Sequence, residues 1–151
     1  MTPTLTAADF WQFSLHHYRQ AGVEAACLQF QDQYQGNVNL ALLLHWLDTQ
    51  SFSLPPQELT ALLTTLAHSD PSLQRFRAQR RVQKAHLSTS TYQALLAEEL
   101  QHERQQQTDL IQQCQTLPLR PAIQPHNLLA YCQHCHVPTV LYRQLQGHTT
   151  D

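Results

Sequence analysis

Cysteine and histidine residues near the C-terminus have a spacing that is also found in haem and zinc sites. Cys132, Cys135 and His136 form C-x-x-C-H, the spacing used to attach c-type haem and one half of a four-ligand zinc site. Covalent haem attachment normally follows export, and residues 1–9 show no basic stretch followed by an apolar one. No second pair stands at zinc-ligand spacing. Because Leu128, Cys132 and Cys135 share one face of a helix, we expect both thiols to pack in the core.

A second candidate for metal chemistry lies in a predicted long helix. Glu99 and His102 form E-x-x-H, which supplies half of a carboxylate-bridged di-iron site in helical bundles. Such a site usually requires a second E-x-x-H, and the chain has none. We therefore expect Glu99 and His102 to be solvated or ion-paired. We predict no metal and no cofactor, and keep zinc or di-iron binding as the alternative.

Residues 75–84 hold five of the nine lysines and arginines. On a helix, one cationic ridge would consist of Arg77, Arg80, Arg81 and Lys84. This ridge could bind a partner protein or, as an alternative, the phosphate backbone of nucleic acid. The following helical segment is acidic at Glu98, Glu99 and Glu103. The alternative to binding a partner is therefore that the basic residues form ion pairs with the acidic helix.

The N-terminal third offers pocket candidates. They are Trp11, Tyr18, His45 and Trp46. His45 interrupts an apolar run, where a histidine is either hydrogen-bonded in the core or in contact with a ligand, and we favour the core. An apolar groove beside Phe10, Trp11 and Tyr18 is a second candidate docking surface.

Hydrophobic periodicity predicts an all-α fold. The expected helices span about 6–22, 23–36, 38–49, 59–67, 73–87, 92–115, 128–135 and 139–145. The third is apolar almost all round and begins at the N-cap Asn37, so we expect it to be the buried central helix. Ser69-Asp70-Pro71 is expected to divide two helices. We predict a single-domain bundle of about six to eight helices, with residues 1–117 as the main bundle and 118–151 as a proline-rich connector and helical hairpin.

The composition of the chain excludes several classes of protein. Only 13% of residues are charged, the formal net charge is −2, and glycine occurs three times. This charge excludes a globally basic nucleic-acid binder, and the chain has no glycine loop for phosphate and no nucleophile elbow. No apolar run approaches the roughly 18 residues of a membrane span. We therefore expect a cytoplasmic protein with no membrane contact and with its four cysteines as free thiols.

Several motifs resemble those of a bacterial family of uncharacterised proteins, best represented in gammaproteobacteria. The main ones are residues 10–15 (FWQFSL), Tyr18, Gly22-Val23, residues 26–29 (ACLQ) and residues 36–46. Weaker matches are Pro71, Arg80-Arg81, Lys84, residues 99–103, Asn127-Leu128 and Tyr131. The chain departs from the family pattern at Asn37, where the pattern has aspartate. The resemblance implies a cytosolic, all-helical protein and supplies no catalytic residue. We therefore predict a non-enzymatic interaction or regulatory protein, with a metal-binding or nucleic-acid-associated protein as the alternative.

Overall fold

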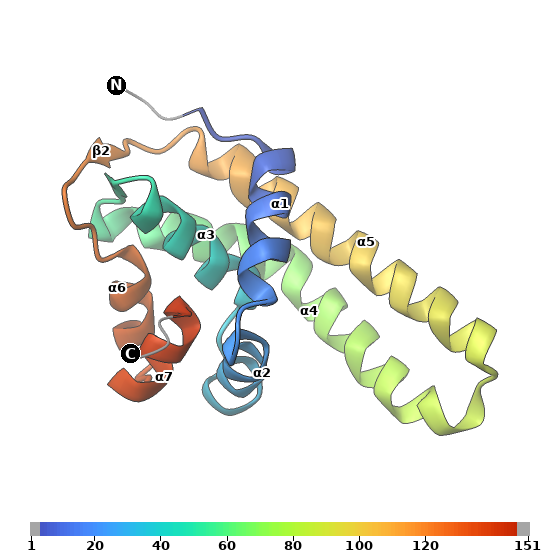
Figure 1. The fold of residues 1–151 in the computed structure, drawn as a ribbon. Coiled ribbons are helices and arrows are strands. Elements are labelled where there is room, and N and C mark those ends of the chain that lie inside the picture. Colours follow the sequence, from blue (N-terminus) through green and yellow to red (C-terminus); the bar gives the residue numbers. More distant parts are fainter. Residues whose placement is uncertain (1–3, 148–151) are drawn as a thin grey trace.

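The computed structural model describes residues 4–147 and confirms the all-α prediction (Figure 1). Its helices are α1 (Ala7–Tyr18), α2 (Val23–Tyr34), α3 (Val38–Thr49), α4 (Leu59–Gln83), α5 (Thr89–Cys114), α6 (Asn127–His134) and α7 (Thr139–Gln146). Short 3-10 helices precede and follow α4, at Pro56–Glu58 and Lys84–His86. The outer limits of the predicted segments, residues 1 and 151, lie outside the described residues.

Helix α3 is the buried central helix, as its sequence predicts. It begins at the N-cap Asn37, whose Oδ1 accepts a hydrogen bond from the backbone N–H of Leu40 at 2.8 Å. Eight of its twelve residues are buried. Helices α1, α5 and α6 pack around it. Burial on nearly every side explains why this helix has no polar face.

Helices α4 and α5 form a long antiparallel pair that extends away from the rest of the fold (Figure 1). The prediction of a helix break at Ser69-Asp70-Pro71 is wrong, because α4 runs through Pro71. Proline removes one backbone hydrogen bond without ending the helix, and the two halves of α4 run in different directions in Figure 1. No helix within residues 4–147 is both long enough and apolar enough to cross a membrane.

The segment after α5 returns to α3 and adds the last two helices to the same core. A short antiparallel pairing joins β1 (Phe52–Ser53) to β2 (Arg120–Pro121), which the sequence did not predict. Helix α6 then starts where the backbone N–H of Asn127 donates to Asp48 Oδ1 at 2.8 Å. Leu128, Tyr131 and Leu141 belong to the main hydrophobic cluster. The C-terminal helices are therefore packed against the bundle.

Candidate functional site

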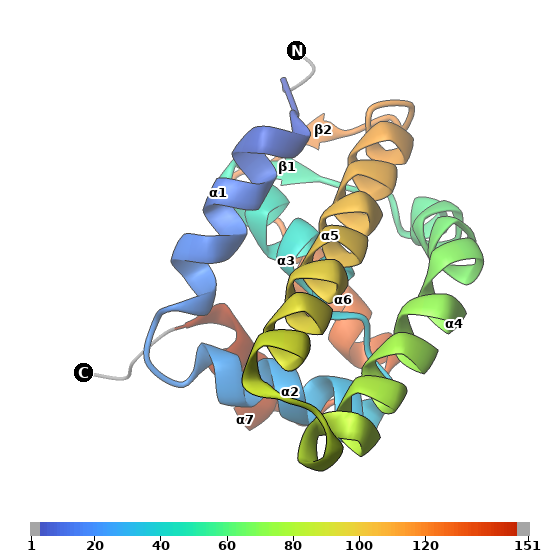
Figure 2. The same cartoon turned by 90° about the vertical axis from the view of Figure 1, so that its right-hand side faces the viewer.

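A groove of about 360 Å³ opens where helices α1 to α5 meet. Its apolar lining consists of Trp11, Leu15, Leu28, Val38, Leu42 and Leu100. Figure 2 shows how α5 lies between α1 and α4, which brings residues far apart in the sequence to one place. Volumes of 300–1,000 Å³ with a mostly apolar lining and a few polar groups are typical of ligand sites. This groove is therefore the candidate functional site.

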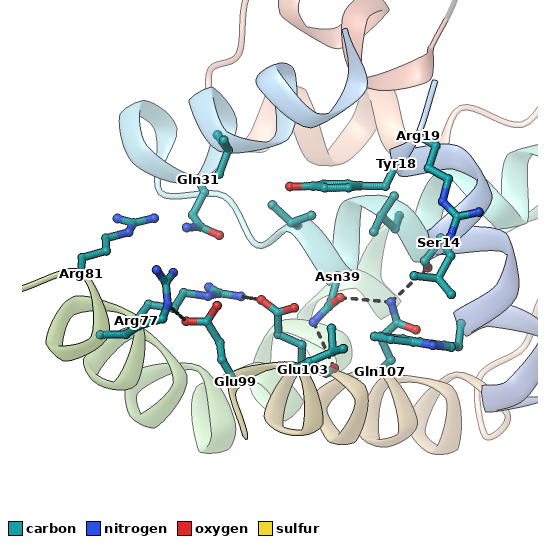
Figure 3. Close-up of a pocket in the computed structure, with 17 residues that line it drawn as sticks. Ser14, Tyr18, Arg19, Gln31, Asn39, Arg77, Arg81, Glu99, Glu103 and Gln107 are labelled. Carbon is teal, nitrogen blue, oxygen red and sulfur yellow. Dashed lines mark hydrogen bonds and ion pairs between the residues drawn. The ribbon is translucent and has the colours of Figure 1, made fainter. Parts of the chain in front are cut away.

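Two ion pairs between α4 and α5 form one wall of the groove. Arg77 Nη2 lies 2.7 Å from Glu103 Oε1, and Arg80 Nε lies 2.8 Å from Glu99 Oε1 (Figure 3). The hydrogen bond to Glu99 raises the pKa of the Arg80 guanidinium, so this guanidinium stays charged. The expected pairing between the basic and acidic helices is confirmed for Glu99 and Glu103. Glu98 instead lies on the outside of α5, with its Oε1 3.8 Å from His102 Nε2.

The four residues of the expected cationic ridge do not form one exposed surface. Arg77 is only 8% exposed, and Arg80 is held by Glu99 and by the hydroxyl of Tyr92 at 3.0 Å. Arg81 is about half exposed, with its guanidinium 3.9 Å from Asp32 Oδ1. Lys84 lies beyond the groove, with its Nζ 5.5 Å from the centre of the Tyr92 ring. Among these cations, Arg81 is the one that the groove presents to solvent.

Polar side chains from α1 and α2 face the ion pairs from the other side of the groove. Figure 3 shows the Tyr18 hydroxyl pointing toward Gln31, above the guanidinium of Arg77. Burial raises the pKa of Tyr18 to about 12, so its phenol keeps its proton at neutral pH. This end of the groove therefore presents O–H and N–H donors.

Gln107 lies at the opposite end of the groove, between α1 and α3. Its Nε2 donates to Ser14 Oγ at 3.0 Å and to Asn39 Oδ1 at 3.1 Å (Figure 3). Gln107 is 2% exposed, and its Oε1 has no hydrogen-bond partner within residues 4–147. An acceptor that is buried and unpaired is uncommon in folded proteins.

The four pocket candidates separate into two pairs. Trp11 and Tyr18 line the groove. His45 and Trp46 do not line it and instead join an aromatic cluster between α1 and α3. In this cluster the Phe13 ring centre lies 5.9 Å from that of His45 and 6.1 Å from that of Trp46. His45 is only partly buried and lies beside the core, not inside it as we expected.

The two metal candidates lack converging ligands. Glu99 faces Arg80 in the groove, whereas His102 is about half exposed and has its ring centre 5.3 Å from that of Phe76. Cys132 is buried in the core and Cys135 is only partly buried, because α6 ends at His134 and leaves Cys135 as its C-cap. His136 is exposed. No group of three or more His, Cys, Asp or Glu side chains in the described part of the chain could hold a metal ion.

The different burial of the cysteines predicts different reactivity. Burial raises the pKa of Cys27, Cys114 and Cys132 to about 12, so these groups remain thiols well above neutral pH. At pH 8, Ellman's reagent should modify Cys135 first, and the other three thiols only when guanidinium chloride unfolds the chain. The variant Cys135→Ser should have no rapidly reacting thiol. Rapid reaction of a second thiol in the native protein would contradict this packing.

The ion pairs predict that two neighbouring arginines contribute unequally to stability. Replacing Arg77 with methionine leaves Glu103 without its partner in a partly buried position, and should lower the free energy of unfolding by about 2 kcal/mol. Arg81→Met removes an exposed cation and should cost less than about 0.5 kcal/mol. Urea unfolding followed by circular dichroism measures both values. A loss below about 0.5 kcal/mol in Arg77→Met as well would contradict this prediction.

Several groove residues were missed by reasoning from sequence. Ser14, Gln31 and Gln107 each carry a neutral polar side chain of a kind that recurs along the chain. Nothing in their local spacing distinguishes them from solvated helix residues. One signal was available for Gln107: it lies four residues after Glu103, and therefore on the same face of α5.

One comparison with known proteins, the match to a family model, covers the whole groove. Residues 9–110 match the model of a family described as proteins of unknown function, DUF2390. All lining residues of the groove, from Trp11 to Gln107, fall in this range, whereas a larger hollow of about 680 Å³ beside α6 is bordered in large part by residues 122–134. No curated protein and no solved structure matches the chain. Because well over half of the chain matches the family model, the chain belongs to the DUF2390 family of proteins of unknown function.

Proposed function

We propose that the protein is a non-enzymatic interaction protein whose groove binds a short acidic and apolar segment of a partner protein. The observation that carries the proposal is the combination of exposed leucines and excess arginine along one groove. Leu28 is 44% exposed and Leu100 is 49% exposed, and both border the groove. Large exposed apolar side chains next to a hollow are typical of protein interaction sites.

The charges of the groove favour an acidic ligand. Four arginines and two glutamates line it. Arg77 and Arg80 are neutralised by Glu103 and Glu99. This leaves Arg19 and Arg81 as the excess cations of the lining, because the contact of Arg81 with Asp32, at 3.9 Å, is exposed and Asp32 does not line the groove. Figure 3 shows these two arginines at opposite ends of the groove. An extended segment with a carboxylate near each end and apolar residues between them would match both the charges and the leucines.

Arg77 adds a buried recognition group to this surface. A guanidinium carries five N–H donors, and the hydrogen bond that Arg77 makes to Glu103 uses a single nitrogen. Together with the Tyr18 hydroxyl and the Gln31 amide, the remaining donors face the space between α2 and α4 (Figure 3). A carboxylate of the partner would accept hydrogen bonds there in a partly desolvated place, where such bonds are strongest.

The nucleic-acid alternative has weaker support. Phosphate binding depends on several freely accessible cations along one surface. Two of the four ridge residues, Arg77 and Arg80, are held in ion pairs. Lys84 lies outside the groove, over the Tyr92 ring. A protein partner that needs one or two accessible arginines fits these positions better.

A random-peptide display library tests the proposal directly. Selection on the wild-type protein, with counter-selection on the double variant Arg19→Glu/Arg81→Glu, should enrich peptides that combine Asp or Glu with large apolar residues. Fluorescence anisotropy of the enriched peptides should show affinity lowered at least about tenfold in the double variant.

The matched control makes the same change of charge elsewhere. Arg75 and Arg143 are exposed and do not line the groove, so Arg75→Glu/Arg143→Glu should bind the enriched peptides as the wild type does. A library that yields no enriched peptide would overturn the proposal. Peptides that bind both double variants equally well would overturn it too.

A further inference from the structure

Four buried amide side chains connect the N-cap of α3 to the inner end of the groove. They are Asn37, Gln106, Asn39 and Gln107, and we call them the amide ladder. Each amide donates to the next one or accepts from it, so the orientation of one amide fixes the orientation of its neighbours.

The orientation of the ladder is set at Asn37. Its Oδ1 accepts from the backbone N–H of Leu40 at 2.8 Å, so its Nδ2 must donate. Nδ2 donates to Gln106 Oε1 at 3.1 Å, and Asn39 Nδ2 donates to the same oxygen at 2.9 Å. Asn39 Oδ1 therefore accepts from Gln107 Nε2 at 3.1 Å.

This sequence of hydrogen bonds ends in an acceptor at the groove. Ser14 cannot complete it, because the Ser14 hydroxyl donates to the carbonyl of Phe10 at 2.8 Å and accepts from Gln107 Nε2. The Tyr18 hydroxyl points toward Gln31, away from Gln107 (Figure 3). Gln107 Oε1 is left as a buried acceptor with no donor among residues 4–147. Gln107 also lines the groove, so this covered oxygen lies next to the groove.

We propose that this end of the groove binds an uncharged hydrogen-bond donor of the docked segment, namely the carboxamide of Asn or Gln or the indole of Trp. The inference rests on the proposed function for the source of the donor. An ammonium group is disfavoured because the groove lining has an excess of arginine. The donor enters by displacing the side chains that cover Oε1, and it supplies the missing partner of a buried carbonyl. The partner segment is therefore both acidic and equipped with an amide or indole N–H.

A pair of small probes tests this subsite without any peptide. In an NMR titration of the full chain, indole should shift the Gln107 side-chain amide and the backbone amides of Ser14 and Asn39. Its affinity should be about tenfold higher than that of 1-methylindole, which has the same shape and no N–H. The variant Gln107→Met should lose this preference, and Gln105→Met, an exposed neighbour on α5 outside the groove, should retain it.

The possible outcomes separate the inference from the proposed function. Equal affinity for the two probes overturns the inference, and so do shifts confined to other parts of the chain or no shift with either probe. If library peptides bind but lose nothing when their Asn, Gln or Trp residues become leucine, the donor subsite is wrong and the proposed docking function stands. A clear indole preference with no enriched peptide supports the subsite and overturns the docking proposal.

Discussion

The variant Gly36→Ala should be strongly destabilised or fail to fold. Gly36 is buried, and a Cβ at this position would overlap the ring of Phe30. The ring has no room to move, because Phe30 is fully buried and meets the Tyr131 ring edge-on at 5.6 Å between centres. Overpacking of a filled core costs about 1–3 kcal/mol and at times more. We expect a loss of about 3 kcal/mol or more in urea unfolding.

The chain offers a control for this substitution and a rescue. Gly22 has a φ of +82° and no atom within 4 Å of an added Cβ, so Gly22→Ala should cost only the strain of the left-handed conformation, about 1 kcal/mol. Adding Phe30→Leu to Gly36→Ala should restore part of the lost stability, because the smaller side chain makes room for the methyl group. A Gly36→Ala protein as stable as Gly22→Ala would show that the Phe30 ring can shift at little cost.

The position of Gly36 matters because it leads directly into α3 and the amide ladder. The backbone N–H of Asn37 donates to the Tyr131 hydroxyl at 2.9 Å, and Tyr131 packs on Phe30. A displaced ring would therefore disturb the residue that orients Gln106, Asn39 and Gln107. Gly36 and Asn37 therefore connect the interior packing to the groove.

The helices with local start signals could be predicted from sequence. Thr6 accepts from the backbone N–H of Asp9, and Ser88 accepts from that of Thr91, as expected of N-caps. Gly147 ends α7 in the left-handed conformation. In each case the signal and the structure involve residues within one helical turn.

Features that depend on distant residues could not be predicted as well. Pro71 was expected to end a helix, but α4 continues through it while it packs against α5. The β1–β2 pairing involves two residues on each side, too few to produce a pattern. The Arg77–Glu103 pair was predictable because opposite charges lie on consecutive helices. The burial of Gln107 was not, because its place on the same helix face as Glu103 does not distinguish a buried glutamine from an exposed one.

Asn37, the N-cap of α3, carries the second large expected effect. Aspartate is as good an N-cap as asparagine, so Asn37→Asp should keep the hydrogen bond to the backbone N–H of Leu40. The other half of the side chain faces Asp70 Oδ1 at 2.9 Å and Gln106 Oε1 at 3.1 Å, and both of these atoms accept hydrogen bonds from Asn37 Nδ2. A carboxylate there would meet two acceptors, one of them charged. We expect the free energy of unfolding to fall by about 3 kcal/mol at neutral pH.

A second substitution should reverse this loss. In Asn37→Asp/Asp70→Asn the carboxylate and the amide change places, so the contact between positions 37 and 70 regains a donor and an acceptor. Urea unfolding of the single and double variants measures the coupling, and we expect the double variant to recover at least about 2 kcal/mol. Asp70→Asn alone should be destabilised less than Asn37→Asp, because it introduces no second carboxylate. If the double variant is no more stable than Asn37→Asp, the hydrogen bond between Asn37 and Asp70 does not account for the loss of stability in the single variant.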